Sequence, residues 1–286
     1  MKHINHYTSS IEIEAAFRGA MAEAGLASRE PVIADGRRHR FRVEGDKAGT
    51  KNGWYILFPD GVPSGAFGSW KTGAKHSWCA KTQRDLTYTE RAAHKKRMDA
   101  ARATREAEDQ SIKKAARDKA AHIWQSSHSA PDSHSYLIKK GVKNHGLRLS
   151  NGSLVIPMRD SAGVLHSLQF IDAEGNKRFL PGGRKRGCYF SIGRPDGKIC
   201  IAEGYATAAS IYQATGHAVA VAFDAGNLRP VAEEIRRKFP RIGIVLCADN
   251  DINTPGNPGL TKAREAAAAV GGLVVFVGGE YAEISY

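Results

Sequence analysis

The second half of this 286-residue chain predicts an α/β fold, with a parallel sheet covered by helices on both faces. Between residues 198 and 277, short and fully apolar runs with strand composition alternate with amphipathic segments of helical spacing. Strands buried on both faces of a parallel sheet have this continuous apolar character. Ligands of such sheets bind beyond the carboxyl ends of the strands.

The elements of this region follow one another without a long loop. The expected strands are KICIAEG, HAVAVAF, RIGIVLCAD and GLVVFV, and the expected helices are YATAASIYQATG, AGNLRPVAEEIRRKF and GLTKAREAAAAVG. Residues 129–195 predict a smaller α+β lobe before the sheet. In this lobe, SLVIPMRD and GVLHSLQFID are expected to form two strands joined by a D-S-A-G turn. A Gly- and Arg-rich segment, KRFLPGGRKRGCYF, follows them.

The first 128 residues predict two further parts. Residues 1–85 form a small β-rich module with one helix over residues 12–26 and strands in RRHRFRVEG and GWYILF. Residues 86–128 form a charged connecting helix, because Ala, Arg, Lys and Glu abound there while large apolar residues are few. Most of its surface should be solvated. A DNA-tracking surface is the alternative for its basic residues, although interspersed acidic residues dilute the charge.

The charge balance indicates a polyanionic partner. The chain has 42 Lys and Arg residues against 29 Asp and Glu residues, a formal net charge of +13, and such an excess most often serves nucleic acid binding. No stretch approaches 18 apolar residues, so no membrane partner is expected. The first residues lack the apolar run of a signal peptide, and a cytoplasmic location is expected. The four cysteines have no CxxC spacing. His76 and Cys79 lack two further ligands nearby, so no zinc is expected.

Three carboxylates stand where a parallel sheet places its ligands. Glu203 ends one predicted strand, and Asp249 and Asp251 end another. If these strands are neighbours, the three groups converge at one edge, and their mutual repulsion calls for a cation. Oxygen donors of this kind select Mg²⁺ or Mn²⁺, which also bind phosphates. The alternative for a single Asp after a strand is a helix N-cap.

These residues resemble a known family. Glu203-Gly204 followed by Asp249-Asn250-Asp251 is similar to the TOPRIM domain shared by bacterial-type primases, type IA and II topoisomerases, and OLD- and M5-type nucleases. Upstream, the segments YLIKKGV, GSLVIPMRDSAGVLHSLQFID and KRFLPGG resemble the lobe that precedes TOPRIM in bacterial DNA primases. Two segments are most similar to primases of conjugative plasmids, phages and phage satellites. They are IAEGYATAASIYQATGHAVAVAFDAGNL and, near the N-terminus, HRFRVEGDKAGTKNGWY. The resemblance implies a TOPRIM-type parallel sheet at residues 196–286.

The resemblance also implies roles for individual residues. Asp249 and Asp251 would be metal ligands, and Glu203 a metal ligand or general acid/base. Gly204 would allow phosphates to approach the backbone. Further residues are expected to contact template or nucleotide: Arg159, Lys177, Arg178 and Arg184, with Lys185 and Arg186 adding charge, and Asp224 and Asn227 at the same edge. Turn formation explains the last two nearly as well. A solvated loop explains Arg184, Lys185 and Arg186 about as well.

The implied function is a DNA primase that makes short primers from nucleoside triphosphates on single-stranded DNA with Mg²⁺ or Mn²⁺. A replicative helicase is a candidate further partner. A TOPRIM nuclease ranks second, a non-catalytic single-strand-binding accessory protein is a third hypothesis, and a topoisomerase lacks a domain to supply its tyrosine.

The N-terminal module departs from bacterial primases, which usually begin with a zinc ribbon. GWYILFPDGVPSGAFGSWKTG resembles the metal-free substitute of plasmid and phage relatives. Its aromatic residues are candidates to stack bases, with lysines to hold phosphates: Trp54, Tyr55, Phe67 and Trp70, with Lys71 and Lys75. Packing in the core of the module is the alternative for the aromatic residues.

Overall fold

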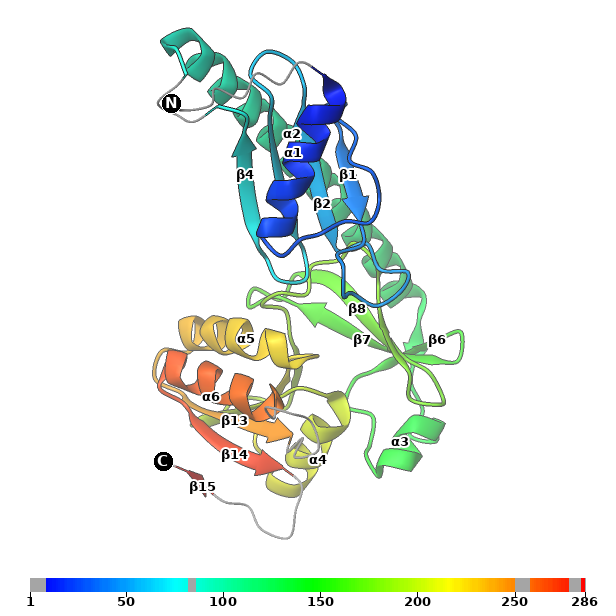
Figure 1. Ribbon diagram of the computed structural model, residues 1–286. Helices are drawn as coiled ribbons and strands as arrows, with labels where there is room; N and C mark the ends of the chain where they lie inside the picture. Colours follow the sequence, from blue (N-terminus) through cyan, green and yellow to red (C-terminus); the bar gives the residue numbers. More distant parts are fainter. Residues whose placement is uncertain (1–8, 82–85, 250–257, 278–283, 286) are drawn as a thin grey trace. The chain divides into compact units, whose positions relative to one another are not determined.

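The computed structural model describes residues 9–81, 86–249, 258–277 and 284–285 (Figure 1). Contacts divide the chain into two compact units, Met1–Ala107 and Glu108–Tyr286. The boundary falls within one long helix, α2 (Tyr88–Ser126). Within the described ranges, each buried apolar cluster belongs to one unit only. Each unit therefore has a core of its own.

The first unit is an antiparallel sheet with a helix across one face. The sheet order is β1 (Arg38–Phe41), β2 (Gly53–Phe58), β3 (Ser64–Ser69) and β4 (Lys75–Cys79). Helix α1 (Ser10–Glu23) begins with a capping box, in which the Ser9 hydroxyl accepts from the Glu12 backbone and the Glu12 carboxylate accepts from the Ser9 backbone. The predicted helix and the two predicted strands are confirmed. The strands β3 and β4 were not predicted individually, because SGAFGS and KHSWC lack an apolar alternation.

The aromatic residues of this unit divide between the two faces of the sheet. Tyr55 and Phe67 pack against Phe17 of α1 and belong to the buried core. For these two residues the structure has the alternative given above, packing in the core of the module, because α1 covers their face. Trp54 and Trp70 lie on the other face, where Trp70 is 44% exposed.

Helix α2 is long, charged and little buried, as its composition predicts. Thr87 and Glu90 form a capping box at its start: the Glu90 carboxylate accepts from the Thr87 backbone at 2.9 Å, and the Thr87 hydroxyl accepts from the Glu90 backbone at 3.2 Å. Only alanines, Ala116 and Ala120, are buried among its residues. The helix is therefore solvated over most of its length.

The second unit begins with an antiparallel lobe. Its sheet order is β5 (His128–Ser129), β6 (Arg148–Ser150), β7 (Ser153–Arg159), β8 (Leu165–Ile171) and β9 (Lys177–Phe179), with α3 (Ser135–Lys140) between β5 and β6. The predicted strand pair is confirmed as β7 and β8, joined by a turn at Asp160. The end of α2 packs on one face of this sheet through Ala120, Ile123 and Trp124.

The parallel sheet of the second unit follows the predicted alternation. Its order is β10 (Phe190–Ile192), β12 (Val219–Val221), β11 (Lys198–Ala202), β13 (Gly243–Asp249), β14 (Leu273–Val277) and β15 (Ile284–Ser285). The four inner strands are parallel, whereas β10 and β15 run antiparallel at the edges. The helices are α4 (Tyr205–Thr215), α5 (Ala225–Lys238) and α6 (Pro258–Val270). The predicted α/β class is confirmed, with two short edge strands that the sequence did not indicate.

Both faces of the parallel sheet are covered. On one face, α4 and the antiparallel lobe share a core with the strands, which includes Leu154, Ile156 and Tyr205. On the other face, α5 and α6 pack through Leu228, Val231 and small alanines. The lobe and the parallel sheet are therefore joined by one continuous core. In the described part of the chain, no helix is both long and apolar enough to cross a bilayer.

Candidate active site

Two of the predicted carboxylates follow neighbouring strands to the same edge of the sheet. Glu203 comes directly after β11, and Asp249 is the last residue of β13. These strands are parallel neighbours, with Ala202 opposite Cys247, so they end side by side about 4.8 Å apart. The prediction that the carboxylates converge required these two strands to be neighbours, and they are. The side chain of Asp249 and the whole of Asp251 lie outside the described residues, so the meeting of all three carboxylates stays a prediction.

Glu203 is partly withdrawn from solvent at this edge. The residue is half-buried, and its Oε1 atom is fully buried. Burial of a carboxylate is unfavourable unless donors or cations compensate it. Among the residues that the structure describes, no three His, Cys, Asp or Glu side chains gather as metal ligands, but two of the predicted three fall outside that search. The all-oxygen donor set suits a hard divalent ion, so the residues present fit such a metal.

A lysine from the lobe reaches the start of the helix that follows Glu203. Gly204 is the N-cap of α4 and makes no side-chain cap. A Cβ atom placed on Gly204 would lie 3.5 Å from Nζ of Lys177, so this ammonium group lies against the backbone of the glycine. Its charge adds to the positive end of the α4 dipole. Together they favour a phosphate at this point.

The predicted arginines of the lobe lie on another face. Arg178 stands opposite Phe170 of β8, with its guanidinium 4.7 Å from the centroid of that ring. Successive residues of a strand point to opposite faces, so Arg178 points away from the face that carries Lys177. Phe170 packs with the end of α2. Arg178 therefore lies on the α2 face of the lobe.

Arg159 also belongs to the α2 face. Its guanidinium lies 5.9 Å from the ring centroid of Trp124, and its Nη1 donates to the carbonyl oxygen of Gly163 at 2.9 Å. The second contact holds the turn after β7. A contact of Arg159 or Arg178 with template or nucleotide stays a prediction.

The basic loop between β9 and β10 is attached to the carboxyl end of β12. Lys185 forms an ion pair with Asp224, and its ammonium lies 5.2 Å from the ring centroid of Phe179. Arg184 lies instead 4.0 Å from the carboxylate of Asp160. The structure therefore brings Lys185 to this edge, and directs Arg184 toward the β7–β8 turn.

Asp224 and Asn227 organise the start of α5. Asp224 is its N-cap, and its Oδ1 accepts from the Asn227 backbone at 3.0 Å. The Asn227 side chain is buried and makes three hydrogen bonds to backbone groups. It accepts from Gly187 N–H at 2.8 Å and donates to the carbonyl oxygens of Cys188 at 3.0 Å and Ala222 at 2.8 Å. These contacts support a positioning role for Asn227.

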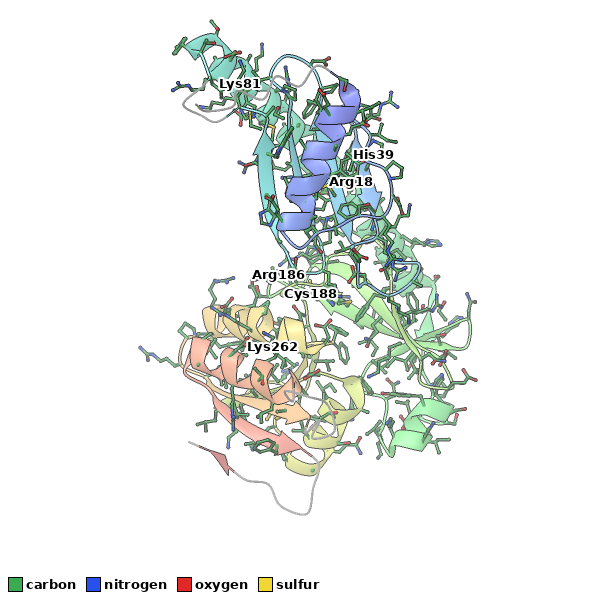
Figure 2. The ribbon with its side chains drawn as sticks, in the orientation of Figure 1. Arg18, His39, Lys81, Arg186, Cys188 and Lys262 are labelled. Carbon is green, nitrogen blue, oxygen red and sulfur yellow. The ribbon has the colours of Figure 1, made fainter. Side chains whose placement is uncertain are left out.

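Cys188 lies at the end of the same loop, near Arg186 (Figure 2). Its side chain is fully buried, and burial raises the pKa of the thiol to about 11. A thiol with this pKa is protonated at neutral pH and is a poor nucleophile. Cys188 is therefore a core residue, as are Cys200 and Cys247.

Two phenylalanines at this edge were not among the predicted site residues. Phe223, two residues after the end of β12, has a φ of +75°, a conformation that bulky residues rarely adopt. Its ring meets the ring of Phe179 edge-on, with centroids 6.3 Å apart. A positive φ at a phenylalanine has no signal in the sequence. Phe179 did have a signal in the sequence, because it stands two residues after Lys177 and therefore lies on the same face of the strand.

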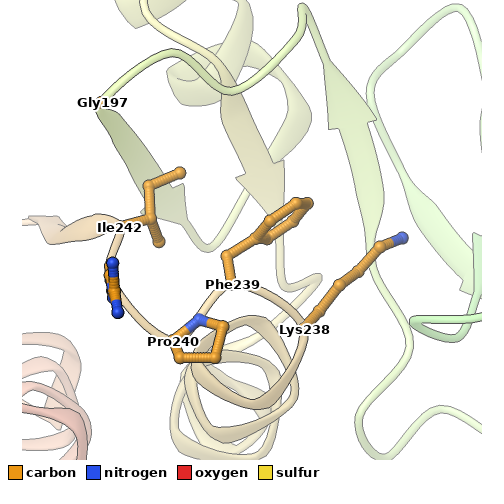
Figure 3. A pocket seen from close by; sticks show the side chains of 6 residues that line it. Gly197, Lys238, Phe239, Pro240 and Ile242 are labelled. Carbon is orange, nitrogen blue, oxygen red and sulfur yellow. The ribbon is translucent and has the colours of Figure 1, made fainter.

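A separate hollow lies at the opposite end of the parallel sheet (Figure 3). Its volume is about 450 Å³, and its lining residues are Gly197, Lys238, Phe239, Pro240, Arg241 and Ile242. Gly197 and Ile242 directly precede β11 and β13. This is the amino end of both strands, whereas parallel sheets bind ligands at the carboxyl ends. The hollow is therefore not part of the candidate active site.

Comparison with known proteins finds a family for the parallel-sheet region. A family model described as the Toprim domain matches residues 197–277, the segment that contains Glu203 and Asp249. Two curated relatives from Escherichia coli, both named DNA primase TraC, are 38% identical over 259 residues and 34% identical over 277 residues. These alignments cover 86% and 91% of this chain but 24% and 19% of the relatives. The chain thus spans about a quarter or less of the length of these primases.

Primases are also found among similar solved structures. The primase fragment of the bacteriophage T7 primase-helicase protein aligns with 50% of this chain and 64% of its own, at 17% identity and a TM-score of 0.39. The Aquifex aeolicus primase aligns with 98% of this chain and 81% of its own, at 13% identity and a TM-score of 0.37. The Toprim match and the two curated relatives, rather than these structures, identify residues 197–277 as a Toprim domain and the chain as a relative of the plasmid-type DNA primases.

Proposed function

We propose that this chain synthesises short primers from nucleoside triphosphates on a single-stranded DNA template. The observation that carries the proposal is the 38% identity to a DNA primase over 86% of the chain. This alignment extends well beyond the Toprim segment of residues 197–277, so the relationship includes the lobe and the first unit. A nuclease that shared only the Toprim domain would not require that similarity.

The residues at the carboxyl edge have distinct tasks in this proposal. Glu203, Asp249 and Asp251 would hold Mg²⁺ or Mn²⁺, which when bound lowers the pKa of a hydroxyl nucleophile and offsets charge at the reacting phosphate. Lys177 would bind a phosphate of the nucleotide beside Gly204. The net charge of +13 would attract the template. A replicative helicase remains a candidate partner from the sequence resemblance alone.

The direct test is a primer-synthesis assay on the full chain. Single-stranded templates of varied sequence are incubated with labelled nucleoside triphosphates and Mg²⁺ or Mn²⁺, and products are resolved by length. We expect short oligomers from the wild type and a loss of at least 100-fold in Glu203→Gln and Asp249→Asn, a size typical for removal of groups that stabilise transition-state charge. Glu265→Gln is the matched control, since Glu265 is an exposed carboxylate of α6 that pairs with Lys262.

Two results would contradict the proposal. One is the absence of oligomers on every template with either metal. The other is cleavage of the DNA strand without nucleoside triphosphates, lost in Glu203→Gln, which would assign the same edge to a nuclease.

A further inference from the structure

Strand β9 passes the carboxyl ends of two strands of the parallel sheet. Lys177 lies against the backbone of Gly204, shortly after β11. Two residues further along β9, the ring of Phe179 meets that of Phe223, shortly after β12. The two positions on β9 are about 6.6 Å apart, since a strand rises about 3.3 Å per residue. A nucleotide with a phosphate bound at Lys177 would therefore have its sugar and base within reach of Phe179.

Phe179 is a partly exposed ring that is held in place by two contacts. The ring of Phe223 meets it edge-on, and the ammonium of Lys185 lies 5.2 Å from its centroid. Lys185 is itself held by the ion pair with Asp224. Even so, 37% of Phe179 remains exposed. A ring already held in one position loses little conformational freedom when a base stacks on it, and every base can stack because each has a π-face.

The backbone of Phe223 is strained at the point where its ring supports Phe179. Its φ of +75° is one that a phenylalanine adopts only when the surrounding structure imposes it. The residues on both sides are fixed, since Ala222 N–H donates to the carbonyl oxygen of Ala202 at 2.8 Å and Asp224 caps α5. Strain of this kind is concentrated at ligand sites. It keeps the ring of Phe223 against Phe179 at the edge of the sheet.

A buried amide stands next to Phe179 on the same face of the lobe. Gln169 of β8 is opposite Phe179 on one side and Ile156 on the other, and residues in register across a sheet project on the same face. Only 2% of Gln169 is exposed. Within the described ranges its side chain makes no hydrogen bond. Because a buried amide without a partner is unfavourable, a ligand that supplies a hydrogen bond here would be favoured.

We propose that Phe179 and Gln169 together bind the nucleoside part of a nucleoside triphosphate. The base stacks on the ring of Phe179, and the amide of Gln169 forms a hydrogen bond with the nucleoside, while the phosphates lie beside Lys177 at the start of α4. This role rests on the proposed primer synthesis and adds to it the groups that recognise the nucleoside. Stacking accepts any base. The pair therefore distinguishes a nucleoside triphosphate from other polyphosphates and leaves the choice of base to the template.

The test is a calorimetric titration of the full chain with ATP and Mg²⁺, in parallel with inorganic tripolyphosphate, which has the phosphates but no nucleoside. No template is added, so no primer is made. We expect Phe179→Ala to weaken ATP binding by about tenfold or more, because one base–aromatic stack has an effect of this size. The same variant should bind tripolyphosphate as the wild type does. Phe179→Tyr should retain ATP binding, and Lys177→Ala should weaken the binding of both ligands.

Gln169→Met separates nucleoside binding from a structural role of the amide. Methionine fills a similar space without an amide. ATP affinity should fall by about fivefold, the effect of one hydrogen bond. The urea midpoint should stay the same or rise, because the amide has no hydrogen-bond partner in the described part of the chain. Tyr88→Ala is the matched control for the aromatic variant: it removes an aromatic residue of the first unit that is 87% exposed and should bind both ligands as the wild type does.

The proposal is overturned if Phe179→Ala, shown to be folded by circular dichroism, binds ATP as tightly as Tyr88→Ala does, or loses affinity equally for ATP and tripolyphosphate. A lower urea midpoint in Gln169→Met would assign its amide to the fold and overturn its role in binding. Primer synthesis by Phe179→Ala with the wild-type KM for ATP would contradict the nucleoside site and support the proposed function. Nucleoside-dependent binding without any primer synthesis would have the reverse meaning.

Discussion

Asn227 shows how a single buried side chain can hold a functional loop in position. Its amide satisfies one N–H group and two carbonyl oxygens of the backbone, on the loop before β10 and at the end of β12. The same loop carries Lys185, which pairs with Asp224. The position of the Lys185 ammonium at the carboxyl edge therefore depends on Asn227, although Asn227 itself is almost fully buried.

We expect Asn227→Ala to lower the free energy of unfolding by about 2–3 kcal/mol, because it leaves buried backbone groups without partners. Urea denaturation measures this change. Asn176→Ala is the control, since Asn176 is exposed and bonds only within its turn to Asp172, and its effect should stay within about 0.5 kcal/mol. Equal effects of the two substitutions would contradict the positioning role.

Asp160 adds a pH-dependent contribution to stability at the β7–β8 turn. Burial alone would raise the pKa of Asp160. The His166 ring, 2.7 Å from its Oδ2, and the backbone N–H groups of Val164 and Ala162 outweigh burial and hold this pKa below its ordinary value. A carboxyl with a lowered pKa stabilises the fold above its unfolded pKa, near 3.9, and this contribution is lost as the pH falls through the folded pKa.

Asp160→Asn should therefore unfold at lower urea concentration than the wild type at pH 7, and the difference should shrink as the pH falls below about 4. Urea midpoints at pH 7 and pH 3 measure it. A difference that stays constant between these two pH values would show that the charge of Asp160 does not contribute.

At the scale of elements, two glycines of the first unit have opposite effects on stability. A Cβ atom on Gly68 of β3 would lie 2.3 Å from the carbonyl oxygen of Ala74 and 2.8 Å from the Trp54 ring. A Cβ atom on Gly19 of α1 would meet nothing within 4 Å. Strand β3 needs Gly68 because its neighbours leave no room for a side chain. In α1, Gly19 meets no such contact, and its greater backbone freedom in the unfolded chain lowers the stability of the helix.

Substitution by alanine should therefore change the stability of the protein in opposite directions at these two positions. Gly68→Ala is expected to lower the thermal midpoint, since overpacking costs about 1–3 kcal/mol. Gly19→Ala is expected to raise the free energy of unfolding by about 0.5–1 kcal/mol. Thermal denaturation followed by circular dichroism measures both changes. An increase in stability in Gly68→Ala would contradict the packing described for β3.

The elements that the sequence predicts have a continuous apolar run or a uniform helical composition. β11, β13 and β14 are continuous apolar runs, and α2 has uniform helix formers over 39 residues. The elements that it missed are two to six residues long, such as β9, β10, β15 and α3. Such segments are too short for a periodicity and owe their conformation to pairing with neighbours.

At the scale of the whole molecule, the two units have separate cores. The buried cluster around Phe17 lies within the first unit, and the clusters around Tyr205 and Leu228 lie within the second. Units with their own cores can unfold independently. We expect calorimetry to resolve two transitions, with Gly68→Ala moving only one and Asn227→Ala only the other. A single transition shifted by both variants would show that the units unfold together.

The candidate site could be predicted only in part, because its residues come from segments far apart in the chain. Glu203 and Asp249 were found because each ends a strand of a parallel sheet. The separation of Lys177 from Arg178 required β9, which has only three residues. The ion pair of Lys185 with Asp224 joins residues 39 positions apart, and no local pattern reports such a contact.

The alternation of β9 has a consequence for how this region can vary in length between homologous proteins. Lys177 and Phe179 share the face toward Gly204 and Phe223, while Arg178 points to the α2 side. A one-residue deletion in the turn before β9 would exchange these faces and place Arg178 where Lys177 now stands. A two-residue change would restore them. Insertions and deletions at this turn are therefore expected in even steps wherever evolution has retained a lysine beside the glycine of α4.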